Sequence, residues 1–226
     1  MSKKADAAGS DQRLVVSAPK MQTVRVSIRG TSPYVSNRMS EESIKKMRDK
    51  QAEGSTSGTK HGARVPKDFE ACYRGSRHIS TDGWDGIPVK AFRAAMIDAC
   101  RLVGYKMTYA KLSLFVDGDG VEEGTGVPLV KIIGTPVKVE SVVTLQGTKT
   151  DIAARAMWRE WSAVLSIRFD ADQFTPEDVV NLLVRAGAQC GVGAGRANSK
   201  NSFGVGWGFF EVVQGAKTPS GRRSTS

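Results

Sequence analysis

The stretch that decides the expected fold is Gly187-Ala188-Gln189-Cys190-Gly191-Val192-Gly193-Ala194-Gly195-Arg196, continued by Phe203-Gly204-Val205-Gly206-Trp207-Gly208. Its glycines permit positive φ angles and let backbone N–H groups approach an anion closely. Arg196 and Lys200 lie inside this loop, and no acidic residue occurs between Asp178 and Glu211. The pattern favours a phosphate-binding loop that uses Gly193 and Gly195. The alternative is a long, flexible hairpin whose glycines only relieve strain.

Hydrophobic periodicity around this loop predicts an α+β domain. Apolar and polar residues alternate over 23–29 and 161–169, which is typical of half-buried strands. Helices are expected over 40–51, 89–103 and 175–186, and further strands over 111–116, 127–133, 137–145 and up to 213. This order predicts a ferredoxin-like (RRM-like) antiparallel sheet with its helices on one face and long inserted loops. The other face of such a sheet commonly binds single-stranded nucleic acid.

Composition divides the 226 residues into one domain and two tails. Residues 1–20 are small and polar, and residues 214–226 are rich in Ser, Gly and Arg, so both tails are expected to be disordered. Residues 21–213 are expected to form a single domain. A basic, glycine-containing loop over 53–80 is expected to be mobile within it.

The charge balance indicates a polyanionic partner. The net charge is +10 and the pI about 9.7, so nucleic acid is the first candidate and an anionic membrane surface the second. No apolar run approaches the roughly 18 residues that a membrane span needs, and we expect no secretory signal. The three cysteines are widely spaced and odd in number, which fits reduced thiols in the cytoplasm. We therefore expect a cytoplasmic protein with no membrane partner, no metal and no cofactor.

Cations with interleaved aromatic rings mark the expected nucleic-acid surface. Cations neutralise phosphates, and each base stacked on an aromatic ring contributes about 1–3 kcal/mol. Outside the glycine loop the expected contacts are Arg38, Lys45, Lys46, Arg48, Lys60, Arg64, Lys67, Tyr73, Arg74, Arg77, Lys149, Arg155, Trp158 and Arg159. A simply solvated helix face is the alternative for Lys45 and Lys46. For Trp158, a stacking platform and a lid over the core are both open.

The glycine loop also carries a family resemblance. Gly191, Gly193, Gly195, Arg196, Ser202, Phe203, Gly204, Gly206 and Gly208 lie between an expected helix and a closing strand. In this respect residues 161–213 resemble the RAMP superfamily, the repeat-associated RNA-binding proteins of CRISPR systems. The resemblance implies a ferredoxin-like fold that binds single-stranded RNA, often as a repeated subunit along the strand. A homo-oligomer on the strand is the corresponding expectation.

A broader resemblance covers most of the chain. Residues 31–40, 87–92, 160–162 and the glycine loop are similar to a group of uncharacterised tailed-phage proteins, whose activity is not established. This resemblance implies a location in the host-cell cytoplasm. The chain is short beside CRISPR backbone subunits, which favours a phage nucleic-acid protein.

Three functions remain open from the sequence. The first is sequence-independent binding of single-stranded RNA or DNA, without enzymatic activity and with possible assembly along the strand. The second is a metal-independent RAMP-type endoribonuclease, with His78 beside Tyr73 and Lys67, or with His61. The third is a phage structural or assembly protein whose charge offsets packaged DNA. The acidic run over 117–123 lacks EF-hand spacing and is expected to be a hairpin turn.

Overall fold

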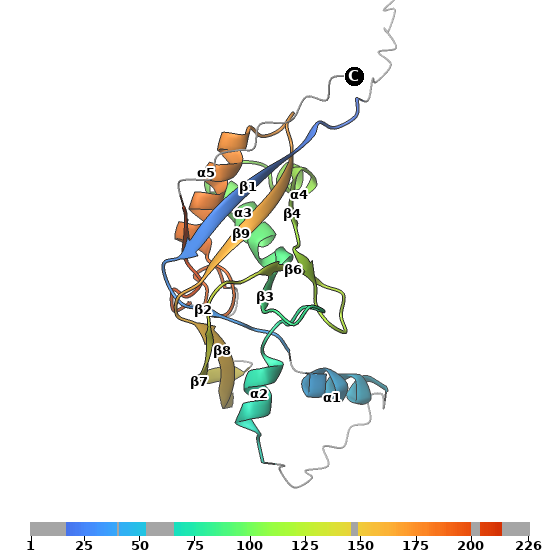
Figure 1. Ribbon diagram of the computed structural model, residues 1–226, viewed down its shortest axis with the longest axis vertical. Coiled ribbons are helices and arrows are strands. Elements are labelled where there is room, and N and C mark those ends of the chain that lie inside the picture. The colour runs from blue at the N-terminus through green and yellow to red at the C-terminus, as the bar shows by residue number, and fades with distance from the viewer. Residues whose placement is uncertain (1–16, 40, 53–65, 146–148, 200–203, 214–226) are drawn as a thin grey trace, which may run out of the picture.

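The structure is a computed structural model that describes residues 17–39, 41–52, 66–145, 149–199 and 204–213 (Figure 1). In chain order its elements are β1 (Met21–Gly30), β2 (Tyr34–Val35), α1 (Glu41–Ala52), α2 (Phe69–Gly75), β3 (Gly86–Pro88), α3 (Val89–Leu102), α4 (Met107–Ser113), β4 (Leu114–Asp117), β5 (Gly120–Val121), β6 (Pro128–Lys131), β7 (Pro136–Leu145), β8 (Lys149–Trp158), β9 (Ser162–Asp170), α5 (Pro176–Arg185), the π-helical turn η1 (Ala186–Cys190) and β10 (Phe210–Val212). The chain is an α+β protein built on antiparallel sheets, as its periodicity predicts.

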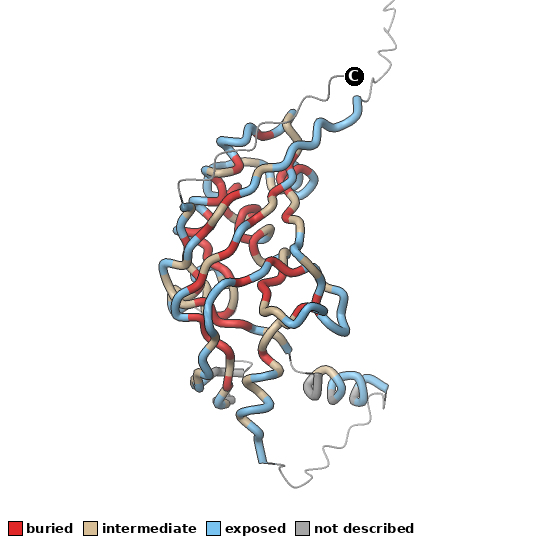
Figure 2. The backbone as a smooth tube through the Cα atoms, viewed as in Figure 1, coloured by how far each residue is buried: buried red, intermediate tan, exposed pale blue. Residues whose placement is uncertain are grey.

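The largest sheet has four strands in the order β10-β1-β9-β4, and every neighbouring pair is antiparallel. In β9 each second residue from Ala163 to Phe169 is buried, and the residues between them are half-buried or exposed. The buried side packs with α3 and α5 in one hydrophobic core that includes Phe92 and Leu183. Each such fully buried apolar side chain stabilises the fold by about 1.5–3 kcal/mol. Figure 2 shows that buried backbone is concentrated in this part of the molecule.

Two smaller antiparallel sheets, β2-β8-β7 and β3-β6-β5, complete the described fold. The chain passes from β1 of the four-stranded sheet directly into β2, which is an edge strand of the β2-β8-β7 sheet. Tyr34 in β2 is buried against Trp158 and Trp161, with ring centroids 5.5 and 5.7 Å apart. This aromatic contact joins β2, β8 and the start of β9.

Helix α5 begins where the sequence predicts and leads into the glycine loop. Thr175 and Asp178 form a reciprocal capping box, and Pro176 occupies the first turn. The helix continues through η1 and ends at Gly191, whose φ of 71° is in the left-handed region. Glycine is favoured there because a Cβ would strain the backbone. The glycine loop therefore starts at a fixed position against the core.

Several sequence expectations are corrected by the structure. The strand expected over 111–116 is half helix, because α4 runs to Ser113 and only β4 is extended. The loop expected over 53–80 is shorter, because α2 forms within it and is capped by the Asp68 carboxylate. Its part over 53–65, the tail over 214–226 and residues 1–16 lie outside the described residues. Within the described segments, no helix is long and apolar enough to span a membrane.

Candidate nucleic-acid interface

A cavity of about 420 Å³ lies between the glycine loop and the start of α3. Lys90 and Arg196 bring two cationic side chains to it, and His78 forms part of the same wall. Among the described residues that line it, Asp98 is the only one with a carboxylate. The positively charged loop predicted from the sequence therefore faces a cavity, and that cavity is also lined by residues from three other parts of the chain.

The first turn of α3 adds positive potential to this cavity. Pro88 is the N-cap residue and makes no side-chain cap, and the first turn contains no acidic residue. The first backbone N–H groups of a helix have no intrahelical partner, and they carry the positive end of the helix dipole. Lys90 and Ala91 of this turn line the cavity. Anions bind readily at such a helix N-terminus, so the cavity suits a phosphate group.

Backbone hydrogen bonds hold the glycine loop in place, and part of the loop lines the cavity. The amide of Ala194 donates to the carbonyl of Val35 at 2.9 Å, and that of Val192 donates to Gly208 at 3.0 Å. Gly193 has φ +82°, and a Cβ there would lie 2.5 Å from the Val35 carbonyl oxygen. Gly193 lines the cavity, whereas a Cβ on Gly195 would meet the Trp207 ring at 2.6 Å. Close packing against Trp207 therefore explains why residue 195 is a glycine. The amides of Val192 and Ala194 already donate hydrogen bonds within the protein, so they are not available to an anion.

Arg196 belongs to the loop and to the cavity at once. Its Nη1 donates to the carbonyl of Gly193 at 3.1 Å, and its side chain is half-buried. A guanidinium has five N–H donors, so one bond to the loop leaves others for an anion. The residue both closes the loop and presents a cation.

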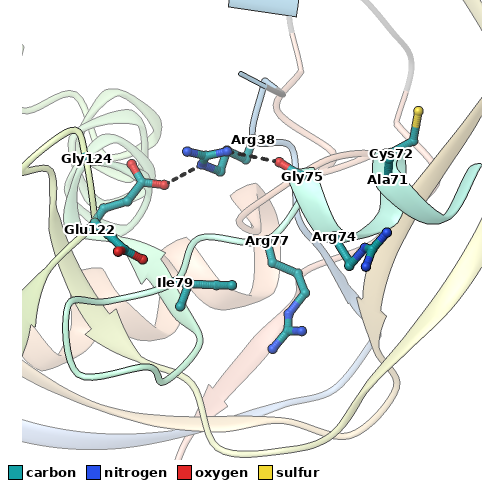
Figure 3. A pocket seen from close by; sticks show the side chains of 10 residues that line it. Arg38, Ala71, Cys72, Arg74, Gly75, Arg77, Ile79, Glu122 and Gly124 are labelled. Atoms are coloured by element: carbon teal, nitrogen blue, oxygen red, sulfur yellow. Dashed lines mark hydrogen bonds and ion pairs between the residues drawn. The ribbon is translucent and has the colours of Figure 1, made fainter. Parts of the chain in front are cut away.

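A buried ion cluster forms the wall beside His78. The Glu122 carboxylate is 4% exposed, and its Oε1 accepts from Arg38 Nε at 2.7 Å. The same oxygen lies 2.8 Å from His78 Nδ1, and the Thr125 hydroxyl donates to Oε2. Figure 3 shows Arg38 reaching from Glu122 to the carbonyl of Gly75, a contact of 3.3 Å. These bonds fix the position of His78.

The cluster shifts the pKa values of both titratable partners. Burial raises the pKa of Glu122, but hydrogen bonds from Thr125, Arg38 and His78 outweigh it, so the net shift is downward. Burial lowers the pKa of His78 and outweighs the opposing hydrogen bond from Glu122. Near neutral pH, Glu122 is therefore ionised and His78 is uncharged.

A second cavity, of about 630 Å³, is lined by Arg38 and Glu122 of this cluster (Figure 3). Arg38, Arg74 and Arg77 line it together with Glu122 and Glu123. Arg77 is paired through two bonds with Asp85, at 2.8 and 2.7 Å. Arg74 is exposed and makes no ion pair with the residues that the structure describes. Of the predicted arginines here, Arg74 is the one available to a ligand.

The structure divides the remaining predicted contacts into three groups. The first group is exposed on the surface and consists of Lys45, Arg48 and Arg159. The second group is already engaged within the protein: Lys67 donates to Asp151 and Ile152, Tyr73 packs against the core, and Arg155 is half-buried. The Lys46 and Lys149 side chains, and all of Lys60, Arg64 and Lys200, lie outside what the structure describes. Lys67 is thus bonded to β8 rather than to His78.

Of the two roles left open for Trp158, its burial excludes the stacking platform. Its side chain is 0% exposed and belongs to the hydrophobic core beside Tyr34 and Ala156. Trp158 ends strand β8, and its ring faces inward there. A nucleobase has no access to this ring.

The helix-free face of the four-stranded sheet is a weaker candidate for binding nucleic acid than the cavity is. Its aromatic residue, Phe115, has the guanidinium carbons of Arg93 and Arg168 at 5.2 and 5.4 Å from the ring centroid. Arg168 is also 3.4 Å from the Asp117 carboxylate. Because these side chains already contact the ring, this face is a poorer platform for base stacking.

Sequence reasoning missed Asn37 and Lys90 as site residues and considered His78 only as a catalytic candidate. They come from three separate segments, and only the folded chain brings them to one cavity. A usable signal was present in Pro88-Val89-Lys90, where a helix opens with a proline and a cation and without an acidic first turn.

Comparison with known proteins does not assign the chain to a family. No family model matches the chain, and no curated protein matches it. Among solved structures, the chain is similar to the crystal structure of Cmr6 from Pyrococcus furiosus at 12% identity and a TM-score of 0.39. That alignment covers 86% of this chain and 99% of the other. A TM-score this low does not establish a shared fold. The resemblances to RAMP and tailed-phage proteins stay predictions.

Proposed function

We propose that this chain binds single-stranded nucleic acid, and that a backbone phosphate occupies the cavity between the glycine loop and α3. The observation that carries the proposal is the convergence of Lys90, Arg196 and the uncapped first turn of α3 on one cavity. Cations and helix N-termini recognise phosphate without reading base identity. Binding is therefore largely independent of sequence, and the net charge of +10 attracts the strand over a longer range.

We also infer that the four-stranded sheet is a ferredoxin-like core. Its strands β1, β4, β9 and β10 occur in that chain order, with α3 between the first two and α5 between the last two. The spatial order β10-β1-β9-β4 is the one that two such strand–helix–strand units produce in this fold. The glycine loop then follows the last helix, as the RAMP resemblance implies. Assembly along the strand is part of the same proposal.

Fluorescence anisotropy with short labelled oligonucleotides tests the proposal. The purified, nuclease-treated protein is titrated with single-stranded RNA, single-stranded DNA and duplex at several salt concentrations. We expect single strands to bind more tightly than duplex, with affinity falling as salt rises. Equal, weak binding to all three would instead indicate generic charge, as expected of a structural phage protein. Light scattering of the saturated complex on longer strands measures assembly.

Cleavage of RNA is a second candidate, favoured by the bond between His78 and Glu122 at the edge of the phosphate cavity. A carboxylate-oriented histidine is a common general base. His78 Nε2 would take the proton from a 2′-hydroxyl, whose oxygen then attacks phosphorus; the bond from phosphorus to the 5′-oxygen breaks, and water protonates that oxygen. Incubating RNA with the protein in chelator distinguishes the two functions. Fragments ending in 2′,3′-cyclic phosphate that vanish with His78→Ala would establish cleavage, and intact RNA would leave binding alone.

A further inference from the structure

We propose that His78 distinguishes RNA from DNA, because its Nε2 atom accepts a hydrogen bond from the ribose 2′-hydroxyl of the nucleotide held in the phosphate cavity. This inference rests on the proposed binding function and names its ligand class, RNA. It assigns His78 the role of a specificity-determining residue whether or not the strand is cut.

The first step is the tautomer of His78. An ionised carboxylate has no proton to give, so every partner of Glu122 must donate to it. Arg38 Nε and the Thr125 hydroxyl do so, and His78 Nδ1 at 2.8 Å must therefore carry a proton as well. A neutral imidazole has a single proton, which leaves Nε2 as an acceptor.

The second step is the accessibility of Nε2. The His78 side chain is 14% exposed and lines the phosphate cavity, while Nδ1 is turned towards Glu122. Among the described residues, Nε2 has no hydrogen-bond partner, and it is not one of the fully buried unpartnered polar atoms. A ligand in the cavity can therefore reach it.

The third step is the chemistry of the group that meets Nε2. A phosphate oxygen is an acceptor, so it does not bind a neutral nitrogen that is also an acceptor. A donor is needed next to a phosphate held by Lys90 and Arg196. The ribose 2′-hydroxyl neighbours the 3′-phosphate and can donate, whereas DNA has hydrogen there. Base N–H groups lie farther from the phosphate than this hydroxyl does.

The position of His78 also makes the discrimination pH-dependent. Charged groups surround it from each neighbouring segment: Glu122 and Arg38 in the buried cluster, Lys90 and Asp98 on α3, and Arg196 in the glycine loop. Histidine is the side chain among these whose charge ordinarily changes between pH 5 and 8. Protonated His78 would present a donor at Nε2, which favours phosphate and no longer selects the hydroxyl.

The test compares three ten-residue strands that share the base uracil. One has ribose, one has 2′-deoxyribose and one has 2′-fluoro-2′-deoxyribose, which keeps an RNA-like sugar pucker but cannot donate. Anisotropy at pH 7.5 should show the ribose strand binding about 3- to 10-fold more tightly than the other two, the equivalent of one hydrogen bond. His78→Ala should reduce this ratio to about one, because the variant has no acceptor for the 2′-hydroxyl.

Retained binding of the deoxyribose strand shows that the His78→Ala site is folded. If that variant does not fold, the wild-type protein alone decides, by whether it binds the ribose strand more tightly than the other two at pH 7.5. Equal affinity of the wild-type protein for ribose and deoxyribose strands at pH 7.5 would overturn the inference but not the proposed function. A ratio that survives His78→Ala would also overturn it. Failure to bind any strand would overturn both.

Discussion

His78 Nδ1 lies 2.8 Å from Glu122 Oε1, and this hydrogen bond joins the walls of two cavities. His78 lines the phosphate cavity, whereas Glu122 lines the cavity that contains Arg74. The pair is anchored from behind by Arg38. A change in either partner is therefore expected to affect both the stability of the fold and the ligand that the first cavity accepts.

Glu122→Ala should destabilise the protein strongly. It leaves Arg38 and His78, both at least 86% buried, without their carboxylate. Removing one partner of a buried ion pair costs about 3–5 kcal/mol of the free energy of unfolding. Urea denaturation measures the loss, and Glu123→Ala is the matched control because that neighbouring carboxylate is exposed. The control should change stability by no more than about 0.5 kcal/mol. Equal effects of the two variants would mean that the cluster is not a stabilising unit.

Gly193→Ala should destabilise the protein more than Gly124→Ala. Both glycines have positive φ, +82° and +77°, so alanine costs about 1–2 kcal/mol of backbone strain at either position. At Gly193 the added Cβ also meets the Val35 carbonyl and the Tyr34 ring, which adds about 1–3 kcal/mol of overpacking. At Gly124 it meets nothing within 4 Å. Similar losses for the two variants in thermal unfolding would show that the loop is not packed against β2.

Arg196→Ala should weaken binding to all single strands by a similar factor. Because the proposal has its guanidinium contact phosphate rather than bases, the slope of log affinity against log salt should become shallower by about 0.7. Arg185→Ala, an exposed arginine on α5 away from the cavity, serves as the control for charge. An unchanged slope in Arg196→Ala would exclude this residue as a phosphate contact.

Stability should decline as the pH falls below neutrality because of His78. Burial lowers the pKa of folded His78, while an unfolded histidine titrates near the ordinary pKa of about 6.5. Where the unfolded state binds more protons, stability rises with pH. The stability that the uncharged, buried His78 contributes is thus complete above about pH 6.5. It is lost as the pH falls through the pKa of His78 in the folded protein.

His78→Gln should flatten this pH dependence between pH 7.5 and pH 5.5 in urea denaturation. A steep profile that remains in this variant would assign the titration to another group.

Trp158→Phe should leave nucleic-acid affinity unchanged. The indole is fully buried, and its N–H has no hydrogen-bond partner among the described residues, so the substitution removes an unsatisfied donor along with some packing. We expect a change in stability below about 1.5 kcal/mol. A loss of affinity at unchanged stability would restore the stacking role for Trp158.

The large periodic elements of this fold are predictable from sequence. Strands β1 and β9 and helices α3 and α5 were expected within a few residues, because burial on one face imposes a clear alternation or helical repeat. Strand β8 was missed, since its buried positions Ala154 and Ala156 are small residues with low strand propensity. Helix α4 was read as strand from a short apolar run, which does not distinguish the two.

The candidate site was only partly predictable. The glycine loop and Arg196 stand out locally, because glycine and charge are visible in one segment of sequence. Lys90 and Asn37 reach the same cavity through tertiary packing, which no local pattern encodes. Predicted cations such as Arg77 are paired with half-buried carboxylates instead, and sequence spacing does not reveal such partners.

The most direct test of the account compares two charge reversals that change the net charge equally. Lys90→Glu places a negative charge in the phosphate cavity, whereas Lys20→Glu alters an exposed lysine that precedes β1. Anisotropy with single-stranded RNA at fixed salt should show at least about a tenfold loss of affinity for Lys90→Glu and less than about a threefold loss for Lys20→Glu. Equal losses would mean that binding follows total charge and that the cavity is not the binding site.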